Sequence, residues 1–265
     1  MRSVTSRHNP IAARFRAMAE EADPTGARVL LDGVHLVRDA RDSGSTFEVV
    51  AVAASRLTSH TEEGLLARTL STAGVNVVEV PDSVMTSISP VRTPSGIVAI
   101  ATRHTAATAE ICAAPNAFIL AAVDVQDPGN VGALVRVAEA GGITGMYVCG
   151  ASANPFSWKA VRGSMGSVLR LPIVAGVKTP DVLLSMKASR MRVVAAVARG
   201  GAEPETVDWS GKVGIVLGGE GPGLSDDVLA SCDARVTIPM APHVESLNVA
   251  TAGAILVYAA RRQRT

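Results

Sequence analysis

Short apolar runs alternating with helix-like stretches constrain the fold of this chain more than any other feature of its sequence. The longest run, residues 117–125, has the length and composition of a strand buried on both faces of a sheet. Further strands, separated by helix-like sequence, are expected at 146–149, 169–174, 191–198, 213–217 and 235–239. The fold class predicted for this half is therefore α/β, with a mostly parallel sheet flanked by helices.

The first hundred residues show the same alternation on a smaller scale. Helices are expected over 11–19, directly after Asn9-Pro10, and over 34–41 and 62–72. The intervening apolar runs predict strands at 29–31, 47–53, 75–80 and 97–101. We divide the chain into an N-terminal α/β domain (1–102), an Ala- and Thr-rich linker (103–115) and a second domain (116–265).

The composition narrows the class of protein. The net charge is +1, so no overall field indicates a polyanionic partner. Cys112, Cys149 and Cys232 are odd in number and far apart, which fits neither a disulfide framework nor a metal site. No segment has the apolar length of a membrane span, and the N-terminus lacks the apolar stretch of a signal peptide. We expect a cytoplasmic protein that binds no metal and no membrane.

The loops after the predicted strands are the candidate site, because open parallel sheets bind ligands at the carboxyl ends of their strands. In the first loop, 126–132, Pro128-Gly129 predicts a turn and Asn130 a helix cap. Gly132 permits close backbone approach, and Arg136 lies on the following helix within reach of the loop. By itself this pattern also fits an ordinary strand–turn–helix unit with an exposed arginine.

The second loop, 216–225, carries four glycines within six positions, directly after a predicted strand. Glu220 inside the loop, with Asp226 and Asp227 after it, disfavours a bound phosphate. The P-loop pattern is absent, and a dinucleotide-binding loop would follow the first strand of its unit. The acidic charge favours a ligand that is cationic at its reacting centre.

The third loop, 238–248, leads into a predicted final helix over 247–262. Ser246 is expected to cap this helix, with Glu245 in the positive field of its N-terminus. His243 and Glu245 have the spacing of a zinc-deaminase motif, but the second motif is absent, so His243 is interpreted as a loop residue.

Together and in this order, the three loops resemble the sequence motifs of the SpoU/TrmH branch of the SPOUT methyltransferases. The matching residues are Asn130, Gly132 and Arg136, then Gly218-Gly219-Glu220-Gly221, Gly223-Leu224, then Ile238-Pro239-Met240 and Ser246-Leu247-Asn248. Arg162-Gly163-Ser164-Met165-Gly166 is also similar to the family. The first half, with Asn9-Pro10, Leu31-Asp32-Gly33 and Thr93-Pro94-Ser95-Gly96-Ile97, resembles the ribosomal-protein-like RNA-binding domain common in this group.

The resemblance implies methyl transfer from S-adenosyl-L-methionine to a ribose 2′-hydroxyl of structured RNA. It also implies a deep C-terminal trefoil knot, and a homodimer whose interface includes the last helix. Cofactor contacts carried over by motif are Gly218, Ile238 and Leu247, with Leu217, Gly219 and Met240 lining the pocket. The glycines would let main chain reach the adenosine.

The catalytic roles are likewise implied by the resemblance. Arg136 would hold the target phosphate and stabilise charge on the 2′-oxygen, because a guanidinium stays protonated in proteins. Asn130, Ser246 and Asn248 would orient cofactor and ribose, and Glu220 would fix Arg136 or a neighbour.

The N-terminal domain would grip RNA first, through candidate phosphate contacts at Arg7, Arg14, Arg16, Arg92 and Arg103. The expected substrate is 23S ribosomal RNA, with transfer RNA as the alternative for the same chemistry. Two other functions stay open: a non-catalytic RNA-binding or ribosome-assembly factor of the same fold, and another enzyme that binds an adenosine-containing ligand. The intact motif residues disfavour the first, and the absent P-loop and dinucleotide-binding patterns disfavour the second.

Overall fold

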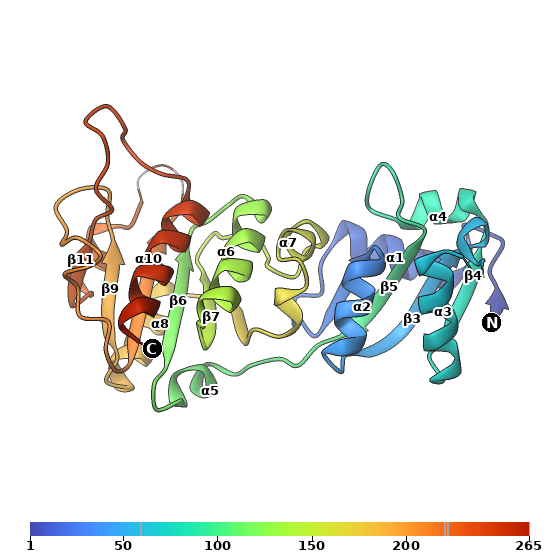
Figure 1. Cartoon of the computed structure of the whole chain (residues 1–265), viewed down its shortest axis with the longest axis horizontal. Helices are drawn as coiled ribbons and strands as arrows, with labels where there is room; N and C mark the ends of the chain where they lie inside the picture. Colours follow the sequence, from blue (N-terminus) through green and yellow to red (C-terminus); the bar gives the residue numbers. More distant parts are fainter. Residues whose placement is uncertain (59, 220, 222, 265) are drawn as a thin grey trace. The chain divides into compact units, whose positions relative to one another are not determined.

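The computed structural model describes all residues except 59, 220, 222 and 265, and the chain forms two compact units (Figure 1). Unit 1 comprises Met1–His104 and Phe156–Leu169; unit 2 comprises Thr105–Pro155 and Arg170–Thr265. The second half of the chain thus contributes one segment to unit 1, which differs from our sequence-based division. The expected linker 103–115 contains a short helix, α5 (Thr108–Ala113).

Unit 1 is built on a five-stranded mixed sheet in the order β1-β4-β3-β5-β2. β1, β3 and β4 are parallel, whereas β5 pairs antiparallel with β2 and β3. Helices α1 and α4 share a core with one face, and α2 and α3 pack against strands β2–β5. The bounds are β1 (Arg2–Ser3), α1 (Pro10–Glu20), β2 (Arg28–Asp32), α2 (Val34–Asp42), β3 (Thr46–Ala53), a 3-10 turn (Ala54–Arg56), α3 (Glu62–Thr72), β4 (Val77–Val80), α4 (Asp82–Ile88) and β5 (Ile97–Thr102).

The segment Phe156–Leu169 carries α7 (Trp158–Gly163) and a 3-10 turn (Ser167–Leu169), and it packs into unit 1. The Phe156 ring fills the space beside Gly26, where a Cβ would lie 2.2 Å from the ring. Arg103 covers the same ring, with 4.5 Å from its guanidinium carbon to the centroid. The Asp39 carboxylate occupies the space beside Gly166, where an added Cβ would lie 2.2 Å from it.

Arg103 is buried, which corrects its expected role as an RNA contact. Its Nε donates to the Val168 carbonyl (3.1 Å) and its Nη1 to the Gly26 carbonyl (3.0 Å). Burial lowers the pKa of this guanidinium to about 10. The residue is only 7% exposed, so a phosphate cannot reach its guanidinium, and its hydrogen bonds link two segments of unit 1.

Unit 2 contains a six-stranded, fully parallel sheet in the order β11-β9-β10-β6-β7-β8, as the alternating pattern predicts. Every residue of β6 is buried, as expected of a strand covered on both faces. The trefoil knot stays a prediction. The elements are β6 (Phe118–Val123), α6 (Pro128–Gly141), β7 (Gly145–Cys149), β8 (Ile173–Val177), α8 (Thr179–Ala188), β9 (Arg192–Ala196), β10 (Val213–Gly218), α9 (Asp226–Ala230), β11 (Ala234–Val236) and α10 (Val249–Gln263).

β8 begins at Ile173, four residues later than expected. Leu169 and Leu171 are buried, but Leu169 ends the 3-10 turn in unit 1. Pro172 then separates them from the strand. The apolar run therefore reflects burial in two different places and not one continuous strand.

Two faces of the parallel sheet are covered differently. α5, α8 and α9 share a core with alternate residues of β6, including Ile119 and Ala121. α6 and α10 lie side by side on the other face (Figure 1). Glycine permits their close approach: a Cβ on Gly141 of α6 would lie 2.0 Å from Val257 Cγ1 of α10. At the ends of both helices, Arg261 Nη1 donates to the Ala140 carbonyl (2.6 Å).

The caps of α6 and α10 differ from the expected ones. Asp127 caps α6, and its Oδ1 accepts from the Asn130 amide (2.8 Å). The reason is Pro128 at the first helical position, which favours an extended residue before it. Asn248, not Ser246, caps α10 by accepting from the amides of Ala250 (2.9 Å) and Thr251 (3.2 Å).

Candidate cofactor and RNA site

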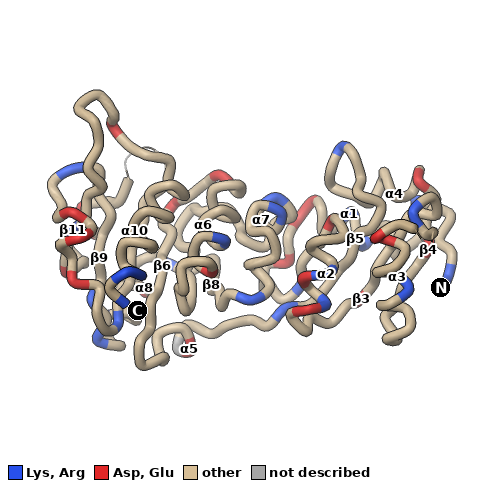
Figure 2. Tube along the Cα trace, in the orientation of Figure 1, with Lys and Arg blue, Asp and Glu red and all other residues tan. Residues whose placement is uncertain are grey.

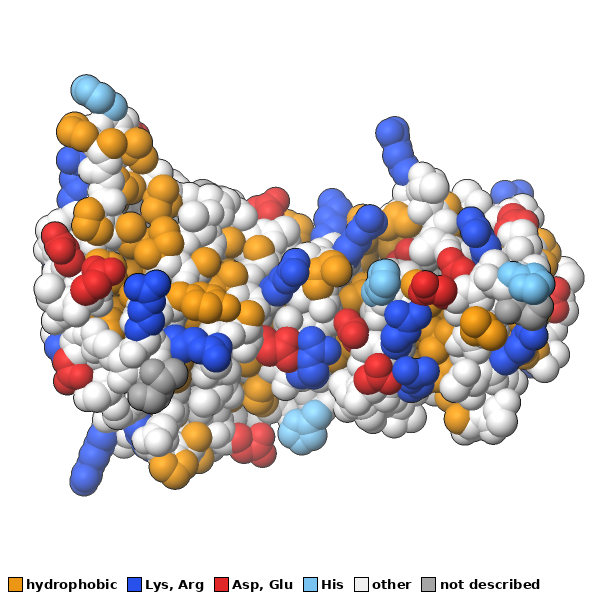
Figure 3. Space-filling view, viewed as in Figure 1, with side chains coloured by type: hydrophobic (Ala, Val, Ile, Leu, Met, Phe, Trp, Pro, Cys, Tyr) orange, Lys and Arg blue, Asp and Glu red, His pale blue; other side chains and the backbone are white. Residues whose placement is uncertain are grey.

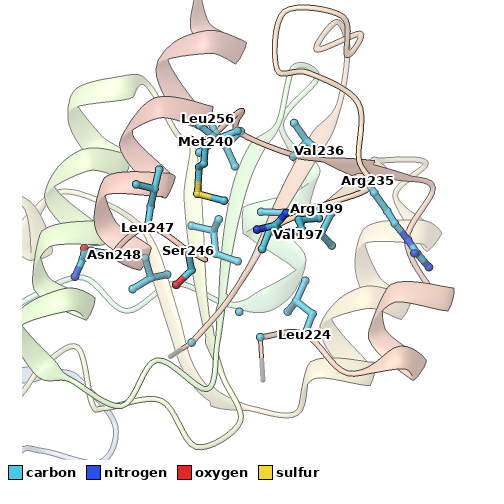
Figure 4. A pocket seen from close by; sticks show the side chains of 18 of the residues that line it. Val197, Arg199, Leu224, Arg235, Val236, Met240, Ser246, Leu247, Asn248 and Leu256 are labelled. Atoms are coloured by element: carbon cyan, nitrogen blue, oxygen red, sulfur yellow. The ribbon is translucent and has the colours of Figure 1, made fainter. Parts of the chain in front are cut away.

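A cavity of about 560 Å³ lies at the carboxyl ends of β9, β10 and β11 (Figure 4). This volume is within the range of small-molecule sites. Its walls include all six residues predicted to contact the cofactor, together with the predicted catalytic residues Ser246 and Asn248. The six are Leu217, Gly218, Gly219, Ile238, Met240 and Leu247. Three segments distant in sequence therefore converge on one cavity, which is here called the β9–β11 cavity.

The walls combine apolar side chains with polar groups, which suits a nucleoside. Leucine, isoleucine, valine and methionine side chains from β10, the 238–247 loop and α10 make up much of the lining, and Figure 4 labels Met240, Leu247 and Leu256 among them. Polar groups come from Ser246 and Asn248 and from the glycine-rich main chain. A flat base and a thioether-like chain can pack on such a surface, while main-chain groups form the specific hydrogen bonds.

The glycines at 218 and 219 are required by contacts within the protein, and their expected role of letting main chain reach the adenosine stays a prediction. A Cβ on Gly219 would lie 1.9 Å from the Asp124 carbonyl oxygen. One on Gly218 would lie 2.7 Å from the Gly223 carbonyl carbon. The Gly219 amide also donates to the Val123 carbonyl (2.7 Å). The glycine-rich loop is thereby held against the end of β6.

Asn130 and Asn248 are in direct contact, as Asn248 Nδ2 donates to Asn130 Oδ1 (2.9 Å). Their helices begin side by side, so this bond joins the first loop of the predicted site to the wall of the β9–β11 cavity. Arg136 is exposed on α6, two turns from its N-terminus. Within the described residues its guanidinium has no ion pair or hydrogen bond, so it can meet an external anion.

Charge in the cavity differs from what the acidic loop indicated. Asp226 and Asp227 form the first turn of α9, whose cap is Ser225, and neither lines the cavity. Glu220, predicted to fix Arg136 or a neighbour, lies outside the described residues. The described lining residues include Arg199 and Arg235 and no carboxylate.

Several lining residues were not predicted. They belong to the loop after β9, to the end of β11 and to α10, and they include Ala196, Val197, Ala198, Arg199, Arg235, Val236, Val249 and Leu256. The rule that ligands bind at carboxyl ends of parallel strands points to the loop after β9. No motif marks it.

The remaining arginines predicted to contact RNA differ in their surroundings. Arg14 pairs with Glu48, and Arg16 Nη1 donates to the Arg7 carbonyl (2.8 Å). Arg7 and Arg92 are exposed. The loop between α4 and β5, which contains Arg92, carries a basic residue at its tip (Figure 2). Arg7 and Arg92 stay the better candidates.

The described residues hold no group of three or more His, Cys, Asp or Glu side chains arranged to bind a metal ion. None of their helices is long and apolar enough to cross a membrane.

Comparison with known proteins agrees with this geometry. The model of the SpoU rRNA Methylase family matches residues 117–258, and that of the MRM3-like substrate binding domain matches residues 25–99. The chain is 31% identical over 264 residues to an uncharacterized tRNA/rRNA methyltransferase of Synechocystis sp., spanning 99% of this chain and 94% of that protein. It is 27% identical over 260 residues to the 23S rRNA (guanosine(2553)-2′-O)-methyltransferase RlmP of Bacillus subtilis, spanning 97% and 98%.

A solved structure extends the likeness to the fold. The AdoMet-bound rRNA methyltransferase from Sinorhizobium meliloti superimposes with a TM-score of 0.85 at 30% identity, covering 98% of this chain and 97% of that one. The fold is thus that of an α/β methyltransferase with a parallel sheet and a smaller N-terminal domain. The chain belongs to the SpoU rRNA methylase family. It is an RNA 2′-O-methyltransferase that uses S-adenosylmethionine.

Proposed function

We propose that this enzyme methylates a ribose 2′-hydroxyl of ribosomal RNA, with 23S RNA the first candidate, and that its cofactor binds in the β9–β11 cavity. The observation that carries the cofactor placement is the convergence of all six predicted contacts on that cavity. The target is supported by the near full-length similarity to RlmP, whose name specifies 23S rRNA. Transfer RNA is the alternative substrate, and the cytoplasm is the proposed location.

S-adenosylmethionine, when bound, supplies a methyl group on a positively charged sulfur. The chain's part is then to place a ribose hydroxyl in line with that methyl and to lower the cost of charge on its oxygen. Asn248 belongs both to the cavity wall and to the pair with Asn130, so this pair would position the ribose beside the cofactor. Arg136 would hold the neighbouring phosphate and stabilise the 2′-oxygen as its proton leaves for solvent.

The RNA would be held in addition by unit 1. Exposed Arg7 and Arg92 are the proposed phosphate contacts, and residues 25–99 match a substrate-binding domain. Contacts of this kind predict an affinity for RNA that falls steeply with salt concentration.

The proposed homodimer uses the outer face of α10. Ile255 and Tyr258 of this helix are 40% and 47% exposed, and apolar side chains gather over α6 and α10 in Figure 3. Light scattering is expected to give twice the mass of one chain, and an Ile255→Glu variant is expected to shift it toward the monomer. A wild-type protein that is monomeric throughout the concentration range would contradict the proposal.

The decisive experiment is methyl transfer by an Arg136→Ala variant. Labelled S-adenosylmethionine and total RNA are supplied, and 2′-O-methyl sites are mapped. Transfer should fall by at least about 100-fold, as for loss of a residue that stabilises developing charge, while calorimetry shows unchanged cofactor affinity. Arg190→Ala, on the loop before β9, is the matched charge control. Retained activity would remove Arg136 from the mechanism, and label only in transfer RNA would overturn the ribosomal target.

A further inference from the structure

We infer that Arg199 binds the carboxylate of the cofactor's methionyl group, an inference that rests on the proposed placement of the cofactor in the β9–β11 cavity. Arg199 lies three residues beyond β9 and lines the cavity. Its guanidinium points into the cavity in Figure 4, whereas Arg235 extends away from it. Within the described part of the chain, no hydrogen bond or ion pair engages the Arg199 guanidinium.

The loop that carries Arg199 is fixed against β11. The amide of Val197 donates to the Val236 carbonyl (2.9 Å), and that of Ala202 donates to the Arg235 carbonyl (2.9 Å). The Thr237 amide in turn donates to the Ala202 carbonyl (2.9 Å). Hydrogen bonds on both sides of Arg199 therefore set the position of its backbone.

Two glycines after Arg199 make this loop possible. Gly200 has φ +78°, a conformation that L side chains rarely adopt. A Cβ on Gly201 would lie 2.7 Å from the Val236 carbonyl carbon. The sequence Arg199-Gly200-Gly201 thus turns the chain tightly beside β11, and Arg199 is the charged residue of this loop that lines the cavity.

The charges of the cofactor identify the group that Arg199 would bind. S-adenosylmethionine carries a sulfonium, an ammonium and one carboxylate, and only the carboxylate attracts a guanidinium. A guanidinium can bind a carboxylate through two parallel hydrogen bonds. No carboxylate occurs among the described lining residues to compete for Arg199. The cavity would then discriminate among adenosine derivatives by their amino-acid end.

The test compares two ligands that differ only in this carboxylate, S-adenosylmethionine and its decarboxylated form. Calorimetry is done on the full-length wild type, Arg199→Gln and Arg235→Gln. Wild type should bind the carboxylate form roughly 10- to 100-fold more tightly, the worth of a hydrogen bond to a charged group. In Arg199→Gln this preference should fall below about threefold, since the interaction energy of the pair is lost. Arg235→Gln, with the same loss of charge at the same cavity, should keep the preference.

Other outcomes separate the inference from the proposed function. A preference unchanged in Arg199→Gln overturns the inference, as does a loss of RNA affinity with no loss of cofactor affinity, which would assign Arg199 to a phosphate. A Leu247→Asp variant tests the cavity itself and should lose both ligands. If both ligands still bind to that variant with wild-type affinity, the cofactor lies elsewhere, and the proposed placement falls with the inference.

Discussion

Several arginines of this chain bind main-chain carbonyls of the protein itself. Arg264 donates to the carbonyls of Trp209 (2.6 Å), Gly211 (2.6 Å) and Asn116 (2.9 Å), with its guanidinium carbon 4.6 Å from the centroid of the Phe118 ring. Arg261 and Arg103 likewise donate to carbonyls. Arg261 and Arg264, at the C-terminal end, are therefore poor indicators of RNA contacts, because their hydrogen bonds complete the fold.

Asp32 is a residue whose titration should make the free energy of unfolding depend on pH. Its carboxylate accepts from the Ser89 hydroxyl (2.6 Å) and the Ser95 hydroxyl (3.0 Å). Burial raises the pKa of this carboxyl, although the two serines and Arg162 act in the opposite direction. The folded chain therefore keeps this proton to higher pH than the unfolded chain, so its contribution to the free energy of unfolding falls as pH rises between the two pKa values.

An Asp32→Asn variant lacks this titration. Its free energy of unfolding, minus that of wild type, should increase from about pH 4 upward and become constant above the folded pKa of Asp32. Urea unfolding at fixed ionic strength measures the difference, in which the other carboxyl groups largely cancel. A difference that is constant or decreases with pH would contradict a raised pKa.

At the scale of elements, the positions of strands could be predicted wherever burial produces a regular run of apolar residues. β6 lies within its predicted run, and β7 and β10 each match theirs to within one residue, because each strand is buried along nearly its whole length. β1 was missed since its two residues are exposed, and α4 since its seven residues give too little of a helical period.

The candidate site was predictable only where a motif marks it. Gly218, Met240 and Leu247 are motif residues and line the β9–β11 cavity. Arg199 was missed, because its place depends on hydrogen bonds between the loop after β9 and the end of β11, which no local pattern specifies. The helix caps were predicted at the wrong residues for the same reason. Several neighbouring residues offer a side-chain oxygen that could cap α6, and the backbone conformation around Pro128 selects Asp127.

The packing of α6 on α10 can be tested with one substitution in each helix and the two combined. Gly141→Ala would place a methyl group 2.0 Å from Val257 Cγ1, and overpacking of this kind destabilises by about 1–3 kcal/mol. Val257→Ala alone should cost about 2 kcal/mol or more through the cavity that it leaves. The double variant should be more stable than the sum of the two losses indicates, as measured by denaturant unfolding. Simple additivity would show that the helices do not meet at this glycine.

At the scale of the whole molecule, unit 1 is discontinuous in sequence, because it combines Met1–His104 with Phe156–Leu169. Phe156 contacts Gly26 and Arg103, and Trp158 packs against the core of unit 1. In the sequence, however, residues 105–155, which belong to unit 2, separate both from the first part of unit 1. A boundary drawn at residue 104 would therefore remove part of the first unit.

A Phe156→Ala variant tests this organisation. Loss of a buried phenylalanine typically costs about 3–5 kcal/mol. Amide hydrogen exchange should accelerate in β2 and β5 of unit 1, while β6 and β10 of unit 2 keep their protection. Equal acceleration in both units would show that they unfold as one body, and no acceleration in β2 would show that the segment is not part of unit 1.

The discontinuity also sets the order in which the nascent chain can mature. When residue 104 leaves the ribosome, the first unit still lacks Phe156–Leu169. At about 5–20 residues per second, translation reaches residue 169 roughly 3–13 s later. During that interval the place beside Gly26 and Arg103 that the Phe156 ring fills in the finished molecule is uncovered, so unit 1 can complete its packing only after residues of unit 2 have been made.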